Sequence, residues 1–422
     1  MIKNWLRFIL STTMVFLSIT FCFAQEQKTH SLKEALQTAR NNNPVLQSER
    51  LNIDMAKSDV ISAKIRPNLT LNHETVQMTN SADFENSAGW YRGGNREELW
   101  EISKPLQIAG QRKHKIDYAY KSLELEEHNY FETERNLFEE VATQWLDVWY
   151  AKKQLEIIES AKIQADSILL INEARYRNQV ITQTDLFRTQ LLVKQYNLEH
   201  KTALQEVSNQ QNRLKFYLGA TDEVQIDMTD EFIFPIPQNF EELLEQASIY
   251  RGDLKVAETY SEVSDSNIKL QKSLAYPQPE VGVIYNPQNS VPHLGFSASI
   301  DLPFFDRNQG ERQKSQIQKD QAESELTTLK TKIENEIAIA YATYQRNKNN
   351  LEDFESLLEQ SQTILDNVKY AYIKGGTTIL DYLEAQNSWL QTQQQYYEVL
   401  QDYRQSFIQL LHTTGLINQL AL

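Results

Sequence analysis

The stretch HLGFSASIDLPFFDRNQGERQKSQ, residues 293–316, changes character halfway along. In its first ten residues apolar side chains alternate with small or polar ones, from Leu294 to Leu302. This period of two predicts a β-strand with one apolar face. After Pro303 and a turn-like DRNQG comes a polar, charged stretch that is typical of a helix. The same change from strand to helix occurs about 200 residues earlier, in LWEISKPLQIAGQRKHKI, residues 99–116.

The recurrence belongs to an internal duplication of the chain. The segment YRNQVITQTDLFRTQ (176–190) aligns with YIKGGTTILDYLEAQ (372–386) at an offset of 196 residues. The opening SLKEALQTARNNNPVL (31–46) aligns with NFEELLEQASIYRGDL (239–254) at an offset of 208. Such self-similarity predicts two repeats of one structural plan. Their predicted bounds are 25–220 and 239–416, with a connector at 221–238 and a C-terminal tail at 417–422.

Each repeat is predicted to contain a short helix, a medium helix, two strands and two long helices. Glycine (12) and proline (10) are scarce among the 422 residues, which favours helices over a loop-rich β protein. The first long run would span about 100 Å as a helix, so it has to pack lengthwise on other helices. The predicted strands are 68–78, 98–106, 280–285 and 293–302, and the predicted long helices are 108–175, 183–218, 309–371 and 378–413.

The last predicted helix shows how such packing is achieved. Ten positions spaced alternately by three and four run from Ile379 to Leu410, and eight of them are apolar or aromatic. A mean spacing of 3.5 residues is typical of a coiled-coil seam. The sequence therefore predicts long helices that associate side by side.

The strands suggest that this part of the chain lies in a membrane. A membrane-spanning strand needs roughly 9–11 residues with one face toward lipid. The strand at 293–302 fits well, whereas alternation in 68–78 breaks near Glu74. Four strands cannot close a barrel, but three copies of the chain would supply twelve. The stretch quoted at the start is then the place where the chain leaves the bilayer.

The N-terminus has the features of a secretory signal peptide. Two basic residues precede the apolar run 8–24, and small residues at its end predict cleavage after Ala24. Residues 1–24 are therefore expected to be removed. Two alternatives stay open: the segment remains as a membrane anchor, or Cys22 is lipidated, although Phe21 before it is not the small residue that lipidation needs.

Composition excludes several classes of function. The formal charge of −15 becomes −17 without the signal peptide, and such acidity argues against a nucleic-acid partner. Cys22 is the only cysteine, so its removal excludes disulfides, thiol catalysis and Cys-ligated metals. The seven histidines lack metal-motif spacing, and no HExxH, P-loop or nucleophile elbow is found. We expect no enzymatic activity, no cofactor and no resident metal.

Strand pairs between long helices, in two repeats behind a signal peptide, resemble the TolC-like outer membrane efflux protein family. The segments that carry the resemblance are SLKEALQTARNNNP (31–44), DLPFFDRNQGER (301–312) and YIKGGTTILDYLEAQ (372–386), in this order. The resemblance covers essentially the whole mature chain. It implies a mainly α protein that forms a homotrimer, with a twelve-stranded β-barrel in the outer membrane lipid and a coiled-coil α-helical barrel across the periplasm of a Gram-negative bacterium.

The resemblance also implies a function. Family members are the exit channels of tripartite efflux systems, with a periplasmic adaptor (membrane fusion) protein and an inner-membrane pump of the RND type as partners. The LPFFDRNQG segment looks most like the heavy-metal cation efflux subgroup, which implies metal cations as cargo. Drug efflux and type I secretion share the same body and remain alternatives. A second alternative is a soluble periplasmic coiled-coil adaptor.

The family resemblance places candidate gate residues at the far ends of the helix pairs. By motif position, Asp381 and Glu384 line the narrowest part of the tunnel. Three copies of each would form acidic rings that favour cations and could hold a divalent ion. The alternative is that Asp381 only caps a helix and interacts with its dipole.

Other residues are expected to support the gate. Tyr372 resembles the tyrosine whose hydroxyl helps to hold the closed state, and Thr184 and Asp185 occupy the equivalent place in the first repeat. Where some members have a latching arginine, this chain has Thr377, so its latch is expected to differ. The residues expected at the adaptor-docking tips of the two turns are Asn178, Gln179, Gly375 and Gly376.

Overall fold

The computed structural model describes residues 29–84, 93–230, 234–237, 239–287 and 291–421. The predicted signal peptide, including Cys22, lies outside these residues. No helix in the described part of the chain is both long enough and apolar enough to cross a membrane.

Two compact units form, and each draws on both repeats. One, the sheet unit, comprises Val45–Arg135 and Leu243–Ile337. The other, the helical unit, comprises the chain up to Pro44, Asn136–Glu242, and Ala338 onward. The sequence repeats are therefore not separate structural domains, because each unit is completed by equivalent pieces of both.

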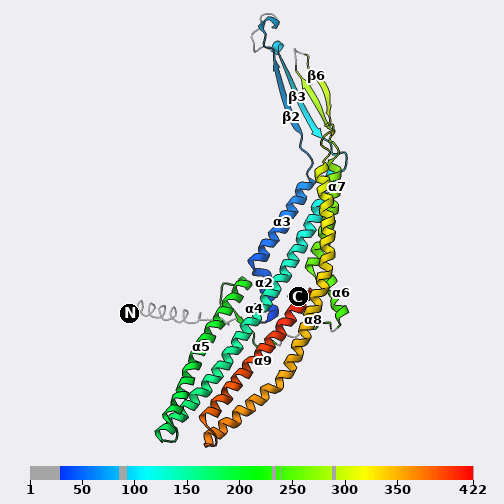
Figure 1. Cartoon of the computed structure of the whole chain (residues 1–422). Helices are drawn as coiled ribbons and strands as arrows, with labels where there is room; N and C mark the ends of the chain where they lie inside the picture. Colours follow the sequence, from blue (N-terminus) through cyan, green and yellow to red (C-terminus); the bar gives the residue numbers. More distant parts are fainter. Residues whose placement is uncertain (1–28, 85–92, 231–233, 238, 288–290, 422) are drawn as a thin grey trace, which may run out of the picture. The chain divides into compact units, whose positions relative to one another are not determined.

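In the sheet unit, four antiparallel strands form one sheet in the order β2-β3-β5-β6 (Figure 1). The strands β3 and β5 pair with each other, so the hairpin of the first repeat joins the hairpin of the second. The strand β6 ends at Ser299, which pairs with Glu280 at the start of β5, so it stops three residues before the predicted end at residue 302. The strands are β2 (Thr70–Gln77), β3 (Arg96–Pro105), β5 (Glu280–Asn286) and β6 (His293–Ser299).

The two faces of this sheet differ in chemistry. One face carries the row Leu71, Ile102, Val283 and Phe296, four residues in register on the four strands, and all four are exposed. The next row, on the opposite face, is Thr70, Ser103, Gly282 and Ser297. On this polar face Ser297 donates a hydrogen bond to Glu101, and Ser103 donates one to Glu280. At this level of the sheet, the predicted alternation of apolar and polar side chains is therefore present on all four strands.

The helices of the sheet unit are α3 (Pro44–Lys64), α7 (Gly252–Leu274) and the first parts of two long helices, α4 (Gln111–Arg177) and α8 (Gln309–Lys374). Helix α6 (Phe240–Tyr250) precedes α7. Near the start of α7 the backbone lies very close to that of α4. A Cβ added to Gly252 would lie only 2.9 Å from the Cα of Glu132 on α4. Buried Arg251 is neutralised there by Asp253 and by Glu336 of α8 at 2.7 Å.

The helical unit contains α2 (Leu32–Asn42), α5 (Gln183–Leu218), α9 (Ile379–Thr413) and the remaining lengths of α4 and α8. A capping box of Ser31 and Glu34 starts α2. Two further elements were not predicted. A short parallel pair joins β1 (Thr29–His30) to β4 (Gln225–Ile226) in the connector. The predicted C-terminal tail forms a 3₁₀ helix, η5 (Leu416–Ala421).

This C-terminal 3₁₀ helix is part of the core of the helical unit. Leu416, Ile417, Leu420 and Ala421 are buried, and the carbonyl of Ala421 accepts a hydrogen bond from Gln37 Nε2 of α2 at 3.2 Å. The segment has only six residues, which is too short for its apolar pattern to be recognised as a helix from the sequence. Only the neighbouring α2 and α9 show that they are buried.

Candidate gate at the ends of the helix pairs

The turns that join α4 to α5 and α8 to α9 have the same hydrogen bonds at equivalent positions. In the first turn, Gln179 N donates to Tyr176 O (2.9 Å) and Val180 N to Arg175 O (2.8 Å). In the second turn, Gly375 N donates to Tyr372 O (3.0 Å) and Gly376 N to Ala371 O (2.8 Å). Each pair is a helix C-cap of the Schellman type.

The two turns differ in how easily they adopt this conformation. The left-handed residue is Gln179, with φ of 60°, in the first turn and Gly375, with φ of 81°, in the second. Glycine adopts positive φ without strain, whereas glutamine does not. The predicted tip residues Asn178, Gln179, Gly375 and Gly376 are all exposed on these turns.

Both following helices begin with a capping box. Thr182 Oγ1 and Asp185 Oδ2 are 2.7 Å apart at the start of α5, and Thr378 Oγ1 and Asp381 Oδ2 are 2.7 Å apart at the start of α9. In each case the backbone N–H of the acid donates back to the threonine hydroxyl. Asp381 therefore does cap a helix, and so does Asp185.

The cap affects the chemistry of Asp381. Its carboxylate accepts hydrogen bonds from Thr377 Oγ1 (2.5 Å), Thr378 Oγ1 and Thr378 N (2.9 Å), and these donors lower its pKa to about 2. The side chain is otherwise exposed. Asp381 is therefore ionised at neutral pH, with a carboxylate accessible from outside the bundle. The hydroxyl of Thr377 stabilises this charge.

Glu384 lies one turn further along α9 and is exposed like Asp381. The intervening Tyr382 and the following Ala385 are buried against the core of the helical unit. Residues three apart in a helix share a face. The two acids thus form an outward pair on one face of α9, as a pore-lining role requires, while the opposite face packs inward.

Tyr372 is buried, and its hydroxyl donates to Asn172 Oδ1 on α4 at 2.6 Å. The amide of Asn172 in turn donates to Thr189 Oγ1 on α5 at 2.8 Å, and that hydroxyl donates to the backbone oxygen of Asp185 at 3.1 Å. This chain, here called the tyrosine network, connects three helices. Thr184 is exposed in the first turn of α5.

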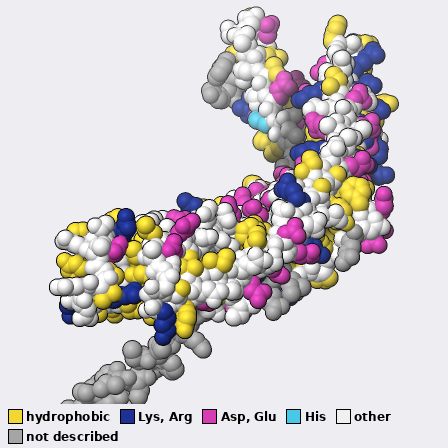
Figure 2. Space-filling view, turned by 60° about the horizontal axis from the view of Figure 1, so that its bottom comes forward, with side chains coloured by type: hydrophobic (Ala, Val, Ile, Leu, Met, Phe, Trp, Pro, Cys, Tyr) yellow, Lys and Arg dark blue, Asp and Glu magenta, His cyan; other side chains and the backbone are white. Residues whose placement is uncertain are grey.

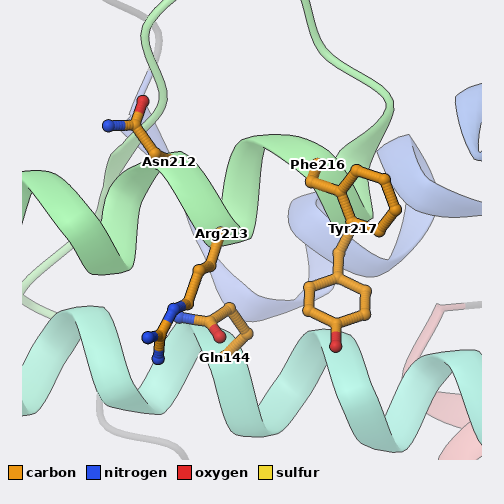
Figure 3. Close-up of a pocket in the computed structure, with 5 residues that line it drawn as sticks. All are labelled: Gln144, Asn212, Arg213, Phe216 and Tyr217. Carbon is orange, nitrogen blue, oxygen red and sulfur yellow. The ribbon is translucent and has the colours of Figure 1, made fainter.

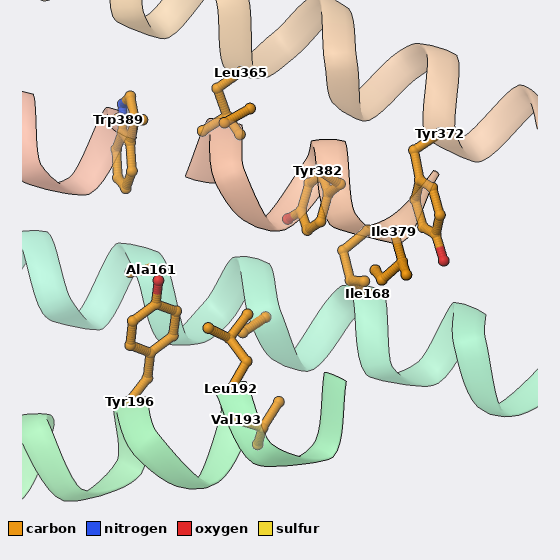
Figure 4. Packing of buried hydrophobic residues seen from close by; sticks show 12 residues of the cluster. Ala161, Ile168, Leu192, Val193, Tyr196, Leu365, Tyr372, Ile379, Tyr382 and Trp389 are labelled. Atoms are coloured by element: carbon orange, nitrogen blue, oxygen red, sulfur yellow. The ribbon is translucent and has the colours of Figure 1, made fainter. Parts of the chain in front are cut away.

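A cation and a second ring complete the surroundings of Tyr372. The guanidinium of Arg175 lies 4.9 Å from the centroid of the Tyr372 ring, and its Nη1 donates to the Tyr372 carbonyl at 3.2 Å. The ring also stacks on Tyr382 at 5.7 Å between centroids. Figure 4 shows Tyr372 and Tyr382 in the apolar cluster with Ile168, Leu365, Ile379 and Trp389.

The sequence analysis missed Asn172, Arg175 and Thr189. A signal for them exists in the duplication: at the offset of 196 they correspond to Val368, Ala371 and Ala385. Three polar residues on one repeat thus replace three apolar ones on the other. Comparing the repeats position by position would have indicated that the first repeat supplies polar partners that the second does not.

A surface hollow of about 560 Å³ lies elsewhere in the helical unit, between α4 and α5 (Figure 3). Gln144, Asn212, Arg213, Phe216 and Tyr217 line it. The Gln144 amide donates to Gln210 Oε1 at 2.7 Å, so it is already satisfied. These lining residues contain no acid–base pair, and within the described ranges no cluster of three or more His, Cys, Asp or Glu side chains could hold a metal ion.

Comparison with known proteins identifies the architecture. A family model described as outer membrane efflux protein matches residues 35–220 and 243–416. No curated protein sequence matches significantly. The structure of a membrane protein from Pseudomonas aeruginosa is 19% identical, with a TM-score of 0.75, covering 91% of this chain and 90% of that one. The structure of CusC is 18% identical, with a TM-score of 0.75, and the match covers 93% of each chain. The outer membrane protein VceC from Vibrio cholerae is 16% identical, with a TM-score of 0.71, covering 91% of this chain and 96% of that one.

The two matched ranges follow the two repeats read from the sequence. At this low identity the solved structures show the fold, which is that of the TolC-like channels: mainly long helices, with two strand pairs inserted between them. The resemblance drawn from the sequence is confirmed. The chain belongs to the outer membrane efflux protein family.

Proposed function

We propose that this protein is the outer membrane channel of a tripartite efflux system. Three copies would form a duct that receives substrate from a periplasmic adaptor and an inner-membrane pump and releases it outside the cell. The observation that supports this best is apolar surface that one chain leaves uncovered in two places, on the sheet and along the long helices. Figure 2 shows hydrophobic side chains interspersed with charged ones on the face in view.

On the helices of the helical unit, exposed apolar residues recur at heptad spacing. Ile163 and Leu170 on α4 are seven apart, as are Leu191 and Leu198 on α5. Leu357 and Ile364 on α8 have the same spacing. A seven-residue repeat is the signature of helices that pack in a coiled coil. These stripes support packing of each protomer against its neighbours.

The sheet also needs a partner. Among the described strands, β2 and β6 form the two edges of the sheet and pair on one side only. Open edges are normally covered or closed. Three copies would join β6 of one protomer to β2 of the next and close a twelve-stranded barrel. Its exposed apolar face would then contact lipid, and its polar face would line the pore.

The proposed class of cargo rests on the two exposed carboxylates near the start of α9. In a trimer, Asp381 and Glu384 would form two rings of three carboxylates where the tunnel is narrowest. Rings of acidic side chains favour cations. Metal cations are therefore the proposed substrate class, in line with the resemblance of the LPFFDRNQG segment to the heavy-metal subgroup. A drug pump or a secretion system as partner would use the same duct.

A direct test reconstitutes the purified protein in planar bilayers and measures the ratio of cation to anion permeability. We expect trimeric channels that prefer cations, and a much weaker preference after Asp381→Asn with Glu384→Gln. Glu352→Gln with Asp353→Asn, two exposed acids on α8, is the matched control and should change little. A monomer without channel activity would reject the duct.

Growth of a deletion strain on metals and on organic toxins then separates the substrate classes. Sensitivity to metals alone, reversed by the intact gene and not by the Asp381→Asn, Glu384→Gln variant, would support cation efflux. Sensitivity to dyes and antibiotics with normal metal tolerance would reject the metal assignment and leave the channel intact.

A further inference from the structure

The chain passes four times between the sheet and the helices of the sheet unit, always at the same end of the sheet. Antiparallel pairing requires this, because Thr70 lies opposite Ser103, Pro105 opposite Glu280, and Glu280 opposite Ser299. Each passage carries a large apolar side chain that is mostly exposed. These residues and their exposed fractions are Ile65 (63%), Ile108 (65%), Tyr276 (62%) and Phe305 (95%).

The fourth passage presents its rings from an ordered turn. Arg307 Nε donates to Pro303 O at 2.9 Å, and Gln309 Nε2 donates to Phe305 O at 3.2 Å. Asn308 Nδ2 donates to Gln271 O of α7 at 3.0 Å, which ties the turn to a neighbouring helix. Phe304, beside Phe305, is exposed as well and continues the apolar alternation of β6. The turn thus holds two aromatic side chains outward.

Taken together, the four passages carry a net positive charge in an acidic protein, although the fourth, 301–315, has three basic and three acidic residues. Over residues 60–66, 104–117, 267–279 and 301–315 there are eleven Lys and Arg against four Asp and Glu, whereas the whole chain has 42 against 57. Arg66, Lys113, Lys115 and Arg307 are exposed. Basic residues therefore lie close in sequence to the apolar side chain of each passage.

We propose that these four passages form an interfacial collar that binds the headgroup region of an anionic phospholipid leaflet. The proposal rests on the channel function, since it requires the sheet to be in a membrane. Aromatic side chains next to Lys and Arg are typical of the boundary between hydrocarbon and water. A protein interface is a poorer fit because seven of the eleven basic residues are lysines, and the cores of such interfaces are depleted of lysine. In a trimer the collar would be a ring of twelve passages on the side of the membrane that faces the helices.

Site-directed spin labelling tests the depth of the collar. Phe305→Cys, in a Cys22→Ser background, carries one spin label per protomer of the trimer in phospholipid nanodiscs. Phe296→Cys on the apolar face of the sheet and Thr328→Cys on an exposed turn of α8 are the matched controls. Oxygen concentrates in hydrocarbon and a polar nickel chelate in water, so the accessibility of a label to the two reagents reports its depth. We expect the label at 305 at the headgroup boundary, the label at 296 in hydrocarbon and the label at 328 in water.

The outcomes are distinct. A label at 305 in water, with 296 in hydrocarbon, would overturn the collar and keep the channel. Labels at both 305 and 296 in water would reject the membrane location of the sheet itself. An immobilised label at 305, inaccessible to both reagents, would mean that another protomer covers the site and would also overturn the proposal.

The charges are tested separately with lipid composition. The melting temperature of the trimer is measured in nanodiscs of phosphatidylcholine with and without phosphatidylglycerol. Anionic lipid attracts surface Lys and Arg, so we expect phosphatidylglycerol to stabilise the wild type. Lys113→Glu with Lys115→Glu should remove most of that increase, and Lys330→Glu with Lys348→Glu, two exposed lysines outside the collar, should leave it. No increase in the wild type, or equal loss in both variants, would contradict the anionic preference.

Discussion

The hydroxyl of Tyr372 and the side-chain oxygen of Asn172 are 2.6 Å apart although the residues are 200 positions apart in sequence. Both side chains are buried, Asn172 completely. This hydrogen bond joins a helix of the second repeat to a helix of the first, close to the two turns of the candidate gate. It provides a specific contact that has to break if the helix pairs separate near their ends.

Tyr372→Phe should destabilise the protein and loosen the gate. Without the hydroxyl, the buried Asn172 oxygen loses its donor, which is expected to lower the free energy of unfolding by about 1–3 kcal/mol. In planar bilayers the variant should show more frequent opening than the wild type. Chemical denaturation and single-channel recording measure the two effects.

The matched control is Tyr382→Phe in the same cluster. The Tyr382 hydroxyl is also buried, but it has no hydrogen-bond partner among the described residues. Removing an unsatisfied polar group is expected to leave stability unchanged or to raise it slightly. If both variants lose the same stability, the hydroxyl of Tyr372 has no special role.

Arg175→Ala should weaken the gate through Tyr372, since the guanidinium contacts both the ring and the carbonyl of that residue. A double-mutant cycle of Arg175→Ala and Tyr372→Leu in denaturation measures this contact, because leucine removes the ring that the guanidinium covers, whereas phenylalanine would keep it. We expect a coupling of about 0.5–1 kcal/mol, as for a partly exposed cation–π contact and at the low end of the range for residues in contact. Additive effects of the two changes would argue that the arginine acts independently.

Gln179→Gly should stabilise the first turn, because Gln179 has a φ of 60° that glycine adopts without strain. The strain relieved is about 1–2 kcal/mol, and part of it is offset by the greater freedom of glycine in the unfolded chain. The net increase is expected to be about 0.5 kcal/mol. The neighbouring Asn178→Gly serves as the control and should not stabilise. A loss of stability in Gln179→Gly would contradict this account.

Gly252→Ala should be strongly destabilising. The added Cβ would lie 2.9 Å from the Cα and 3.1 Å from the N of Glu132, and backbone atoms of a long helix cannot move away easily. Overpacking of this kind is expected to lower stability by about 1–3 kcal/mol. Gly310→Ala is the control, since its Cβ would meet nothing within 4 Å. Equal melting temperatures for the two variants would show that α4 and α7 are not so close.

The cap at the start of α9 should respond to acid. The folded-state pKa of Asp381 is about 2, below the ordinary value of 3.8. Its contribution to stability is therefore present above pH 4 and is lost as the pH falls through about 2. In a Glu384→Gln background, cation preference should likewise persist at pH 4 and decline only below it. A midpoint clearly above 4 would mean that repulsion among the three carboxylates outweighs the hydrogen bonds of the cap.

Much of this protein could be predicted from local patterns. Alternation in HLGFSASI indicates β6, and the spacing of Thr378 and Asp381 indicates the start of α9, because hydrogen bonds and side-chain direction within a few residues determine such elements. The duplication was visible because both repeats keep the same turns and caps. Asp381 and Glu384 are selected by motif position; α9 places both on one exposed face, and their role in a gate stays a prediction.

Other features depended on the tertiary structure. The pairing of β3 with β5, the short β1–β4 pair and the burial of η5 join residues that are far apart in sequence, so no local period reports them. The partner of Tyr372 could not be predicted for the same reason: Asn172 is 200 residues away, and its neighbours in sequence do not mark it as buried. The sequence by itself determined the long helices, the four strands of the sheet, the turns and the repeats of this protein, through interactions within a few residues. Only the tertiary structure decided which of them meet, because burial and long-range hydrogen bonds depend on how the whole chain packs.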